Sequence, residues 1–287
     1  MIDLLQQRLQ SYNAANRLEE ENAIKEILQE IALYALWRAD FFDVALFQGG
    51  TSLRILHDLP RFSEDLDFIL AKPDPEFNWT PYLNVLLQIF EEFGIQSEAL
   101  RKGSMEQRIR KAVIKDTTII KQLDLSFSGR NEREKIRIKL EIDVTPPAFS
   151  GEARTFLDFP LDYEVRHQDL SSNLALKTHA LLCREYLKGR DWYDFSWYVA
   201  KGVTPNLQHL QAALLQFGPW SQERDIPVDM DWLHDAMTEK IASISWPQAR
   251  DDVRRFLRPR EAESLTLWSE VFFITKLAKL IQNIASN

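Results

Sequence analysis

Apolar residues recur at three- and four-residue steps over most of the first forty positions of the chain. This spacing places them on one face of a helix, so we predict helices over 4–12 and 18–42. The apolar run 44–48 predicts a short strand, and a glycine pair then opens a helix that reaches about residue 57. A second strand is expected over 65–70, where the sequence reads DLDFIL.

Two long strands are predicted in the middle of the chain, after a proline-rich loop over 72–81 and a helix over 82–93. The segments 111–128 and 135–147 flank the polar turn GRNERE, as in a long hairpin. In the second segment, apolar and polar residues alternate until two prolines stop the strand.

After about residue 169 the chain returns to helical spacing and keeps it to the end. We therefore expect an α+β domain over 1–168, which includes the N-terminal helices, and a helical C-terminal domain over 169–287. A chain of 287 residues is long enough for two ordinary domains.

Charge is distributed unevenly along the chain. The net charge of -8 and the pI of about 5.3 argue against a generally basic nucleic-acid coat protein. Between residues 101 and 139, however, twelve Lys and Arg outnumber five Asp and Glu, so this basic sector carries +7 and the remainder -15. Such a sector predicts a docking surface for a polyanion such as RNA, although a solvated pair of charged strands has the same composition.

The sequence has no sign of a secretory signal or a membrane segment. The N-terminal stretch MIDLLQQRLQSYN lacks the apolar core of a signal peptide, and the apolar run 265–284 is interrupted by charged residues. The single cysteine, Cys183, cannot form a disulfide within the chain. These features predict a cytoplasmic protein.

Two carboxylates, Asp65 and Asp67, alternate within the apolar strand 65–70. Residues i and i+2 of a strand project from the same face, so these side chains are expected to point together. Two like charges held this close repel each other and are costly to desolvate unless a cation lies between them. A divalent metal ion with oxygen ligands is the natural partner, although two exposed acids on an edge strand are an ordinary alternative.

A third carboxylate, Asp143, lies just before the two prolines that end the strand 135–147. If that strand lies beside 65–70, Asp143 could complete a three-carboxylate site for two Mg²⁺ ions, or for Mn²⁺ in their place. The alternative is a surface aspartate that balances Arg137 or Lys139.

The glycine pair Gly49 and Gly50 follows one predicted strand and opens the next helix. Backbone N–H groups of such glycines can approach phosphate oxygens, and the positive end of the helix dipole favours negative charge. The next two residues, Thr51 and Ser52, could add hydroxyl donors or could be ordinary helix-capping residues.

Two further polar residues, Arg61 and Ser63, lie just before the carboxylate pair. They are candidates for contact with a nucleotide, although Arg61 could equally pair with Glu64 on the surface. The sequence contains neither GxxxxGK[ST] nor GxGxxG, so a Walker or Rossmann phosphate loop is absent. Its five histidines are scattered without the spacing of a zinc site.

The last candidate residues lie within 177–194. Lys177 is on a mostly apolar helix, where its ammonium group either reaches solvent or meets an anion. Asp191 and Asp194 open the next helix, and acidic residues are common there because they favour the positive end of the dipole. The three could contact a nucleotide or could be surface and helix-start charges.

In this order, these motifs resemble the nucleotidyltransferase (polymerase β-like) superfamily and, more specifically, the AbiEii/AbiGii toxin family. The similarity lies in GGTSLRILHDLPRFSEDLDF, LEIDVTPP and ALKTHALLCREYLKGRDWYDF, within about residues 20–200. It implies the nucleotidyltransferase fold, a mixed sheet with flanking helices, followed by a helical part. It also implies a toxin of a type IV toxin–antitoxin or phage abortive-infection system, with a cognate antitoxin encoded nearby.

The resemblance also implies a role for each candidate residue. The Mg²⁺ ions would be bound by three carboxylates: Asp65, Asp67 and Asp143. The nucleotide phosphates would be contacted by the first motif: Gly49, Gly50 and Thr51 or Ser52. Lys177 would contact the triphosphate or base, and either Asp191 or Asp194 would be the acid of the fourth motif.

The predicted reaction is Mg²⁺-dependent transfer of NMP from an NTP to an RNA acceptor, and the resemblance points to a tRNA 3′ end. The basic sector favours RNA. Two alternatives fit the same residues: nucleotidylation of a Ser, Thr or Tyr hydroxyl on a protein, and a non-catalytic module that binds NTP and works through a partner.

Overall fold

The computed structural model describes residues 1–102, 108–116, 118–127 and 136–285. The chain forms two compact units. The core unit comprises Met1–Asp58, Phe62–Pro146 and Arg154–His167. The helical unit comprises Leu59–Arg61, Pro147–Ala153 and Gln168–Asn287. It therefore includes two short segments from the region that we assigned to the first domain.

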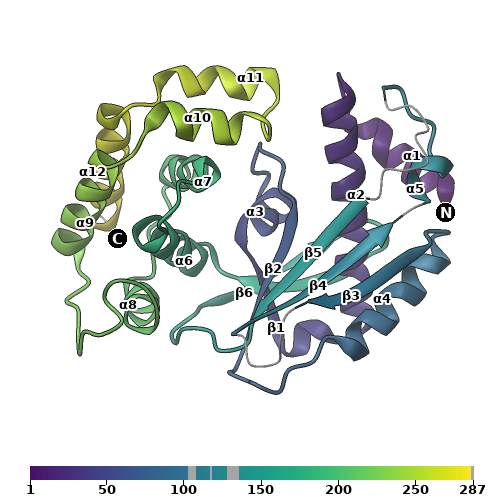
Figure 1. Cartoon of the computed structure of the whole chain (residues 1–287), viewed down its shortest axis with the longest axis horizontal. Coiled ribbons are helices and arrows are strands. Elements are labelled where there is room, and N and C mark those ends of the chain that lie inside the picture. Colours follow the sequence, from purple (N-terminus) through teal and green to yellow (C-terminus); the bar gives the residue numbers. More distant parts are fainter. Residues whose placement is uncertain (103–107, 117, 128–135, 286–287) are drawn as a thin grey trace. The chain divides into compact units, whose positions relative to one another are not determined.

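A seven-stranded mixed sheet forms the centre of the core unit, with strand order β3-β4-β5-β2-β1-β7-β6 (Figure 1). The strands are β1 (Ala45–Gln48), β2 (Asp65–Leu70), β3 (Ser97–Lys102), β4 (Ile109–Asp116), β5 (Ile136–Asp143), β6 (Glu152–Leu157) and β7 (Tyr163–Gln168). β2 is parallel to β5, and β1 is parallel to β7. The pairs β1–β2, β3–β4 and β4–β5 are antiparallel.

The core unit also contains helices that pack against this sheet. They are α1 (Ile2–Ser11), α2 (Arg17–Arg38), η1 (Phe41–Asp43), α3 (Gly49–His57), α4 (Thr80–Glu92) and α5 (Ile119–Gln122). α2 and α4 pack against each other, and α4 lies beside β3 (Figure 1). The side chain of Asn16 accepts a hydrogen bond from the Glu19 N–H and so caps the start of α2.

Alternation over residues 65–68 of β2 separates the apolar face of the sheet from a polar face, on which Ile69 is also buried. Leu66, Phe68 and Leu70 are buried in the core that also contains the apolar residues of α2 and α4. Asp65 and Asp67 project from the opposite side, because successive strand residues face opposite ways. The sequence pattern therefore places both carboxylates outside the hydrophobic core.

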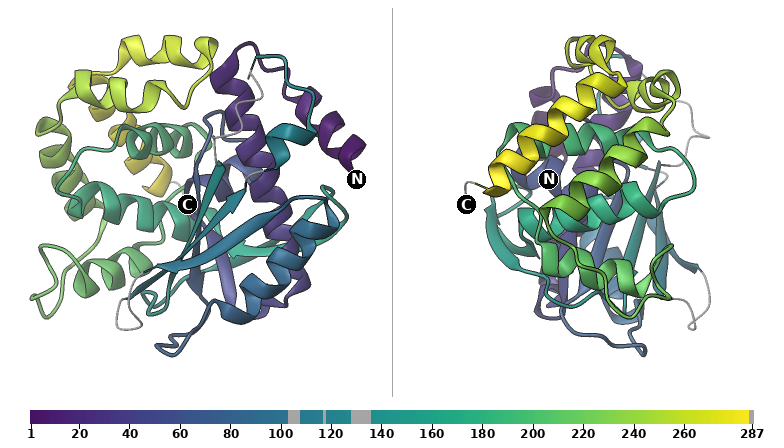
Figure 2. Two further views of the ribbon diagram at one scale, coloured as in Figure 1. Left: turned by 45° about the vertical axis from the view of Figure 1, so that its right-hand side comes forward. Right: turned by 90° about the vertical axis from the view of Figure 1, so that its left-hand side faces the viewer.

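The helical unit is built from α6 (Leu170–Cys183), α7 (Gly189–Ala200), α8 (Leu207–Gln216), α9 (Met230–Ala242), α10 (Trp246–Arg254), α11 (Pro259–Ala262), η2 (Glu263–Leu267) and α12 (Glu270–Ala285). Figure 2 shows α12, in yellow, packed beside α9. Aromatic rings fill the interior: Trp246 stacks on Phe273 with centroids 4.2 Å apart, and Trp192 meets both edge-on.

The predicted α+β class, the mixed sheet and the C-terminal helices are confirmed. The predicted strand over 111–128 is wrong in its second half, because residues 119–122 form α5. Asp116 causes this change: its carboxylate accepts hydrogen bonds from the backbone N–H groups of Thr118 and Ile119, which turns the chain out of β4. The turn GRNERE lies outside the described residues.

Two strands, β6 and β7, were missed by the sequence pattern. β6 has no fully buried residue, so its sequence EARTFL lacks the apolar alternation of a half-buried strand. β7 alternates only through Tyr163, Val165 and His167. Among the described residues, no helix is both long and apolar enough to cross a membrane.

Candidate active site

The carboxylates of Asp65 and Asp67 lie at the start of β2, between two paired strands. On one side Asp67 is in register with Gln48 of β1, the residue before α3. On the other side Asp65 is in register with Lys139 and Asp67 with Glu141, both on β5. Residues in register project from the same face of a sheet, so the polar face carries three acids at this point.

The close approach of α3 to Asp67 explains why the helix opens on glycine. Gly49 has φ +78°, and a Cβ atom placed on it would lie 2.7 Å from Oδ2 of Asp67. Any side chain there would both strain the backbone and displace the carboxylate. The glycine therefore brings the backbone of the helix start against one of the candidate metal ligands.

The hydroxyl groups that follow the glycine pair bind the protein's own backbone. Thr51 Oγ1 donates to the carbonyl oxygen of Asp65, and Ser52 Oγ donates to the carbonyl of Gly49 at 2.9 Å. Both residues are buried. The Thr51 hydroxyl group therefore ties α3 to β2, and the Ser52 hydroxyl group bonds within the first turn of α3. The backbone N–H groups at the start of α3 are thus the better candidates for phosphate contact.

Glu141, which the sequence pattern did not single out, is the β5 acid in register with Asp67. Asp143 is in register with Ile69, two residues further along the strand. Its carboxylate is held by the guanidinium of Arg108 at 2.8–2.9 Å through Nε and accepts the backbone N–H of Thr145 at 2.9 Å. The register therefore adds Glu141 as a candidate for the third carboxylate, and the role of Asp143 stays a prediction.

Basic side chains compensate the acids of this face. Lys139 Nζ lies 3.3 Å from Oδ1 of Asp65, and Lys111 Nζ lies 3.0 Å from Oε1 of Glu141. Both lysine side chains are well exposed, at 56% and 45%, so they can rotate away.

These carboxylate oxygens are the donor type that Mg²⁺ prefers. As the side chains stand, no three acidic, His or Cys side chains of the described chain converge on one point. Metal binding by Asp65, Asp67 and Glu141 therefore requires their side chains to turn inward, with Lys139 displaced.

Four other predicted site residues meet in the helical unit. Lys177 Nζ lies 3.0 Å from Asp191 Oδ1 and 2.9 Å from Asp194 Oδ2. Arg61 donates two hydrogen bonds to the carboxylate of Asp194, from Nε to Oδ1 at 2.6 Å and from Nη2 to Oδ2 at 2.7 Å. Arg184 pairs with the remaining oxygen of Asp191.

This network is buried, and its charges stabilise one another. Burial raises the pKa of Asp191, but Lys177, Lys188 and Arg184 outweigh burial and lower that pKa to about 2. The pKa of Asp194 is raised by burial and lowered by Arg61 and Lys177, and the net shift is downward.

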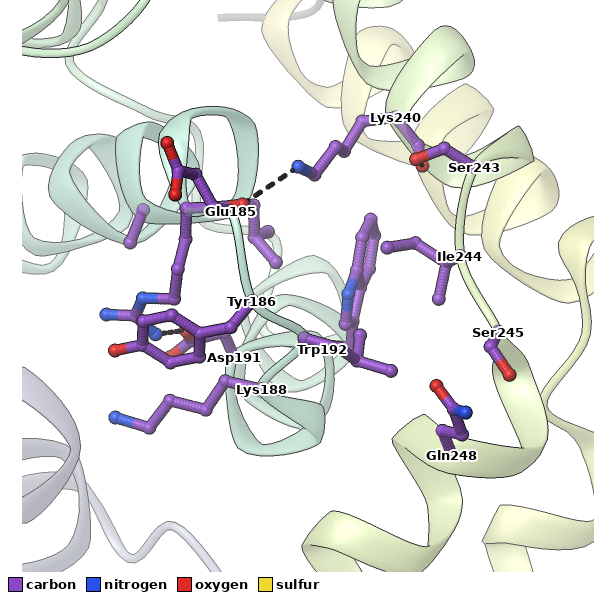
Figure 3. A pocket seen from close by; sticks show the side chains of 14 residues that line it. Glu185, Tyr186, Lys188, Asp191, Trp192, Lys240, Ser243, Ile244, Ser245 and Gln248 are labelled. Carbon is purple, nitrogen blue, oxygen red and sulfur yellow. Dashed lines mark hydrogen bonds and ion pairs between the residues drawn. The ribbon is translucent and has the colours of Figure 1, made fainter.

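The two acids of the network are both buried, but they differ in their position relative to a cavity. Asp194 is completely buried, whereas Asp191 lines a cavity of the helical unit (Figure 3). Ser63, in contrast, belongs to the core unit, where its carbonyl oxygen accepts a hydrogen bond from Gln29 Nε2 at 3.2 Å. The structure thus gathers Arg61 with Lys177 and both acids.

Comparison with known proteins identifies the family. Residues 31–270 match the family described as "Nucleotidyl transferase AbiEii toxin, Type IV TA system". The chain belongs to the AbiEii family. The match extends through both units, and it confirms the resemblance drawn from the four motifs.

Solved structures show that the AbiEii chain shares its fold with nucleotidyltransferase-like proteins. A candidate nucleotidyltransferase from H. pylori has 16% identity and a TM-score of 0.50, with 90% of this chain and 92% of that chain covered. JHP933 from Helicobacter pylori has 16% identity and a TM-score of 0.50, with coverages of 93% and 97%. No curated protein matches the chain.

Replacement of Gly49 by alanine is expected to lower nucleotidyl transfer about tenfold or more, because it displaces the carboxylate of Asp67, a candidate metal ligand. Gly202→Ala is the matched control, because Gly202 has φ +75° but no atom within 4 Å of an added Cβ. Both variants should lose about 1 to 2 kcal/mol of stability from the positive φ. Thermal unfolding and transfer rates are measured together; equal transfer by the two variants would refute the role of the Gly49–Asp67 contact.

Proposed function

We propose that this AbiEii protein transfers NMP from an NTP to a hydroxyl group of an RNA acceptor, with Mg²⁺ or Mn²⁺ as the metal. The observation that carries this proposal is the pair Asp65 and Asp67, held on the polar face of the sheet against Gly49 at the start of α3. Membership of a nucleotidyltransferase family supports the reaction class.

Asp65, Asp67 and Glu141 would hold the metal, which when bound would neutralise charge on the triphosphate and the leaving pyrophosphate. The backbone N–H groups at the start of α3 would face phosphate oxygens. The acceptor oxygen forms a bond to the α-phosphorus while the bond from this phosphorus to the bridging oxygen breaks. The acceptor proton passes to a carboxylate, for which Glu141 is our candidate. Positioning and charge supply the catalysis, with no covalent enzyme intermediate.

Asp191 is the better candidate for the acid of the fourth family motif. It lines a cavity, and its carboxylate is bound to Lys177 and Arg184. Asp194 is closed off by its double hydrogen bond to Arg61. We therefore assign Lys177 and Asp191 to nucleotide contact, and Arg61 and Asp194 to the support of that pair.

An RNA acceptor is favoured by the basic sector. The strand register places four of its cations on the same face of the sheet as Asp65: Lys111, Lys115, Arg137 and Lys139. Arg110 faces the other way and is buried, with its guanidinium bound to the carbonyl oxygen of Pro75 at 2.7 Å. Arg130, Arg133 and Lys135 lie outside the described residues.

The finer parts of the proposal rest on the resemblance drawn from the sequence motifs. They are a tRNA 3′ end as the acceptor, a cognate antitoxin as the partner, a role in phage defence, and a cytoplasmic location. The description of the family as a type IV toxin supports the antitoxin.

The proposal is tested by incubating the purified protein with Mg²⁺, total tRNA and each α-³²P-labelled NTP in turn. We expect label on RNA, and its amount with each nucleotide gives the NTP preference. Label on protein instead would overturn the choice of acceptor. NTP binding without label on any molecule would overturn the transferase itself and favour a non-catalytic module.

A further inference from the structure

The helical unit contains a cavity of about 200 Å³ that the proposed reaction does not use, except at Asp191. It lies where the end of α6, the start of α7, the end of α9 and the start of α10 meet. Three cations line it, namely Arg184, Lys188 and Lys240, together with two acids, Glu185 and Asp191 (Figure 3). The ammonium group of Lys240 donates to the carbonyl oxygens of Leu182 and Arg184. The volume of the cavity is below the roughly 300–1,000 Å³ of pockets that enclose a drug-sized ligand, so it suits a small group such as a phosphate.

Positive charge at this cavity is only partly compensated. Asp191 is shared among Lys177, Arg184 and Lys188, and the first two contact it directly. Within the described chain, the ammonium group of Lys188 makes no hydrogen bond and no direct ion pair. Burial lowers the pKa of Lys188, Asp191 raises it, and Lys177, Arg190 and Arg184 lower it further, so that the net shift is downward. An anion beside Lys188 would relieve this repulsion.

Two helix starts add to the attraction for an anion. Lys188 is the residue before α7, and Ser245 is the residue before α10. Neither side chain caps its helix, and both line the cavity. The positive ends of the two helix dipoles therefore lie at the same cavity as the three cations, and at the start of α7 the Gly189 N–H already donates to Asp252 Oδ2 at 2.8 Å.

An aromatic ring lies at the rim of the cavity. Tyr186 is 66% exposed, and the guanidinium of Arg184 lies 5.0 Å from its ring centroid. Figure 3 shows Tyr186 beside Lys188 and Asp191, with Lys240 and Gln248 across the cavity. An exposed ring next to a phosphate-sized cationic cavity is the arrangement that receives a base and its phosphate together.

We propose that this cavity binds the phosphate of a nucleotide through Lys188 and Arg184, while the base of that nucleotide stacks on Tyr186. The nucleotide is either a free one or the terminal nucleotide of an RNA chain. The class of ligand rests on the proposed function, whereas the anion site itself rests on the cavity and its charges.

The test is calorimetric titration of the full chain with AMP and with a four-nucleotide RNA, in EDTA so that metal-dependent binding is removed. Lys188→Met should weaken AMP binding by about tenfold or more, as expected for one lost charge-assisted hydrogen bond. Lys279→Met is the matched control, because Lys279 is an exposed lysine of the same unit that does not line the cavity. Equal affinity of Lys188→Met and Lys279→Met would overturn the proposal.

Three further variants test whether the base contributes separately from the phosphate, and whether the ligand binds in this cavity rather than in the core unit. Tyr186→Ala should weaken AMP binding but leave pyrophosphate binding unchanged, and Tyr186→Phe should restore AMP binding.

Asp67→Asn should bind AMP as well as the parent does; loss of binding in this variant would place the ligand in the core unit and overturn the proposal. These titrations measure binding and not nucleotidyl transfer, so they can succeed or fail whether or not the proposed reaction is correct. If the four-nucleotide RNA binds more tightly than AMP, and Lys188→Met weakens this binding, the natural ligand is the terminal nucleotide of an RNA chain.

Discussion

Nucleotidyl transfer is expected to fall by about a thousandfold or more when Asp65 or Asp67 is replaced by asparagine, because a metal ion supplies several kcal/mol of transition-state stabilisation. Asparagine keeps the size of the side chain and removes the charge that would bind the metal. Glu141→Gln should have an effect of the same order, since Glu141 is in register with Asp67. The measurement is the rate of label transfer from the preferred NTP.

Asp143→Asn is the matched control for these variants. Asp143 belongs to the same strand face as Glu141 but is held by Arg108 and by the Thr145 N–H. If Glu141 is the third metal ligand, as we propose, this variant should retain transfer within about tenfold of the parent. If instead Asp143→Asn abolished transfer and Glu141→Gln did not, the assignment of the third carboxylate would be reversed. Unaltered thermal unfolding of each variant would separate lost chemistry from lost structure.

The second large effect concerns stability. Replacement of Asp194 by alanine should lower the free energy of unfolding by about 3 to 5 kcal/mol, because it leaves buried cations without their partner. Arg61 has 2% of its side chain exposed and makes two hydrogen bonds to the carboxylate that is removed. Urea unfolding followed by tryptophan fluorescence measures the loss.

Asp235→Ala is the matched control, because Asp235 is an aspartate of the same unit that is 86% exposed and pairs only with the neighbouring His234 among the described residues. It should change stability little. The double variant Arg61→Met/Asp194→Leu should recover much of the loss, since apolar residues of similar size can replace a buried ion pair. A destabilisation by Asp194→Ala no larger than that of Asp235→Ala would contradict the buried network.

The same network predicts a specific dependence of stability on pH. The pKa of Asp191 is lowered from 3.8 to about 2, and that of Asp194 is lowered as well. A carboxyl group with a lowered pKa contributes its stability above its unfolded pKa and loses it as the pH falls through its folded pKa. The contribution should therefore be constant from neutral pH to about pH 5 and disappear between about pH 4 and 2. Asp194→Ala should flatten this part of the profile.

Local pattern was enough to predict most of the core unit. The alternation in DLDFIL gave both the strand and the shared face of its two carboxylates, and the glycine pair gave the start of α3. These features depend on neighbouring residues alone. In contrast, β6 carries no buried residue, so a pattern of burial had nothing to detect there.

The third carboxylate could not be chosen from the sequence. Glu141 and Asp143 share one face of β5, because they are two residues apart. Which of them lies beside Asp67 depends on the register between strands that are about seventy residues apart in the chain, and register is set by the whole sheet. The ion pair between Arg61 and Asp194 could not be predicted either, because the two residues are 133 positions apart and only the tertiary structure brings them together.

The segment Leu59–Arg61 lies in the chain between α3 and β2, yet it belongs to the helical unit. A fragment that ends at residue 168 would therefore keep Arg61 and lack Asp194. Likewise, a single recombination event near that position would join an arginine from one ancestor to an aspartate from another. The two units are thus expected to be inherited together, and a stable half-length version of the protein is not expected to arise by simple truncation.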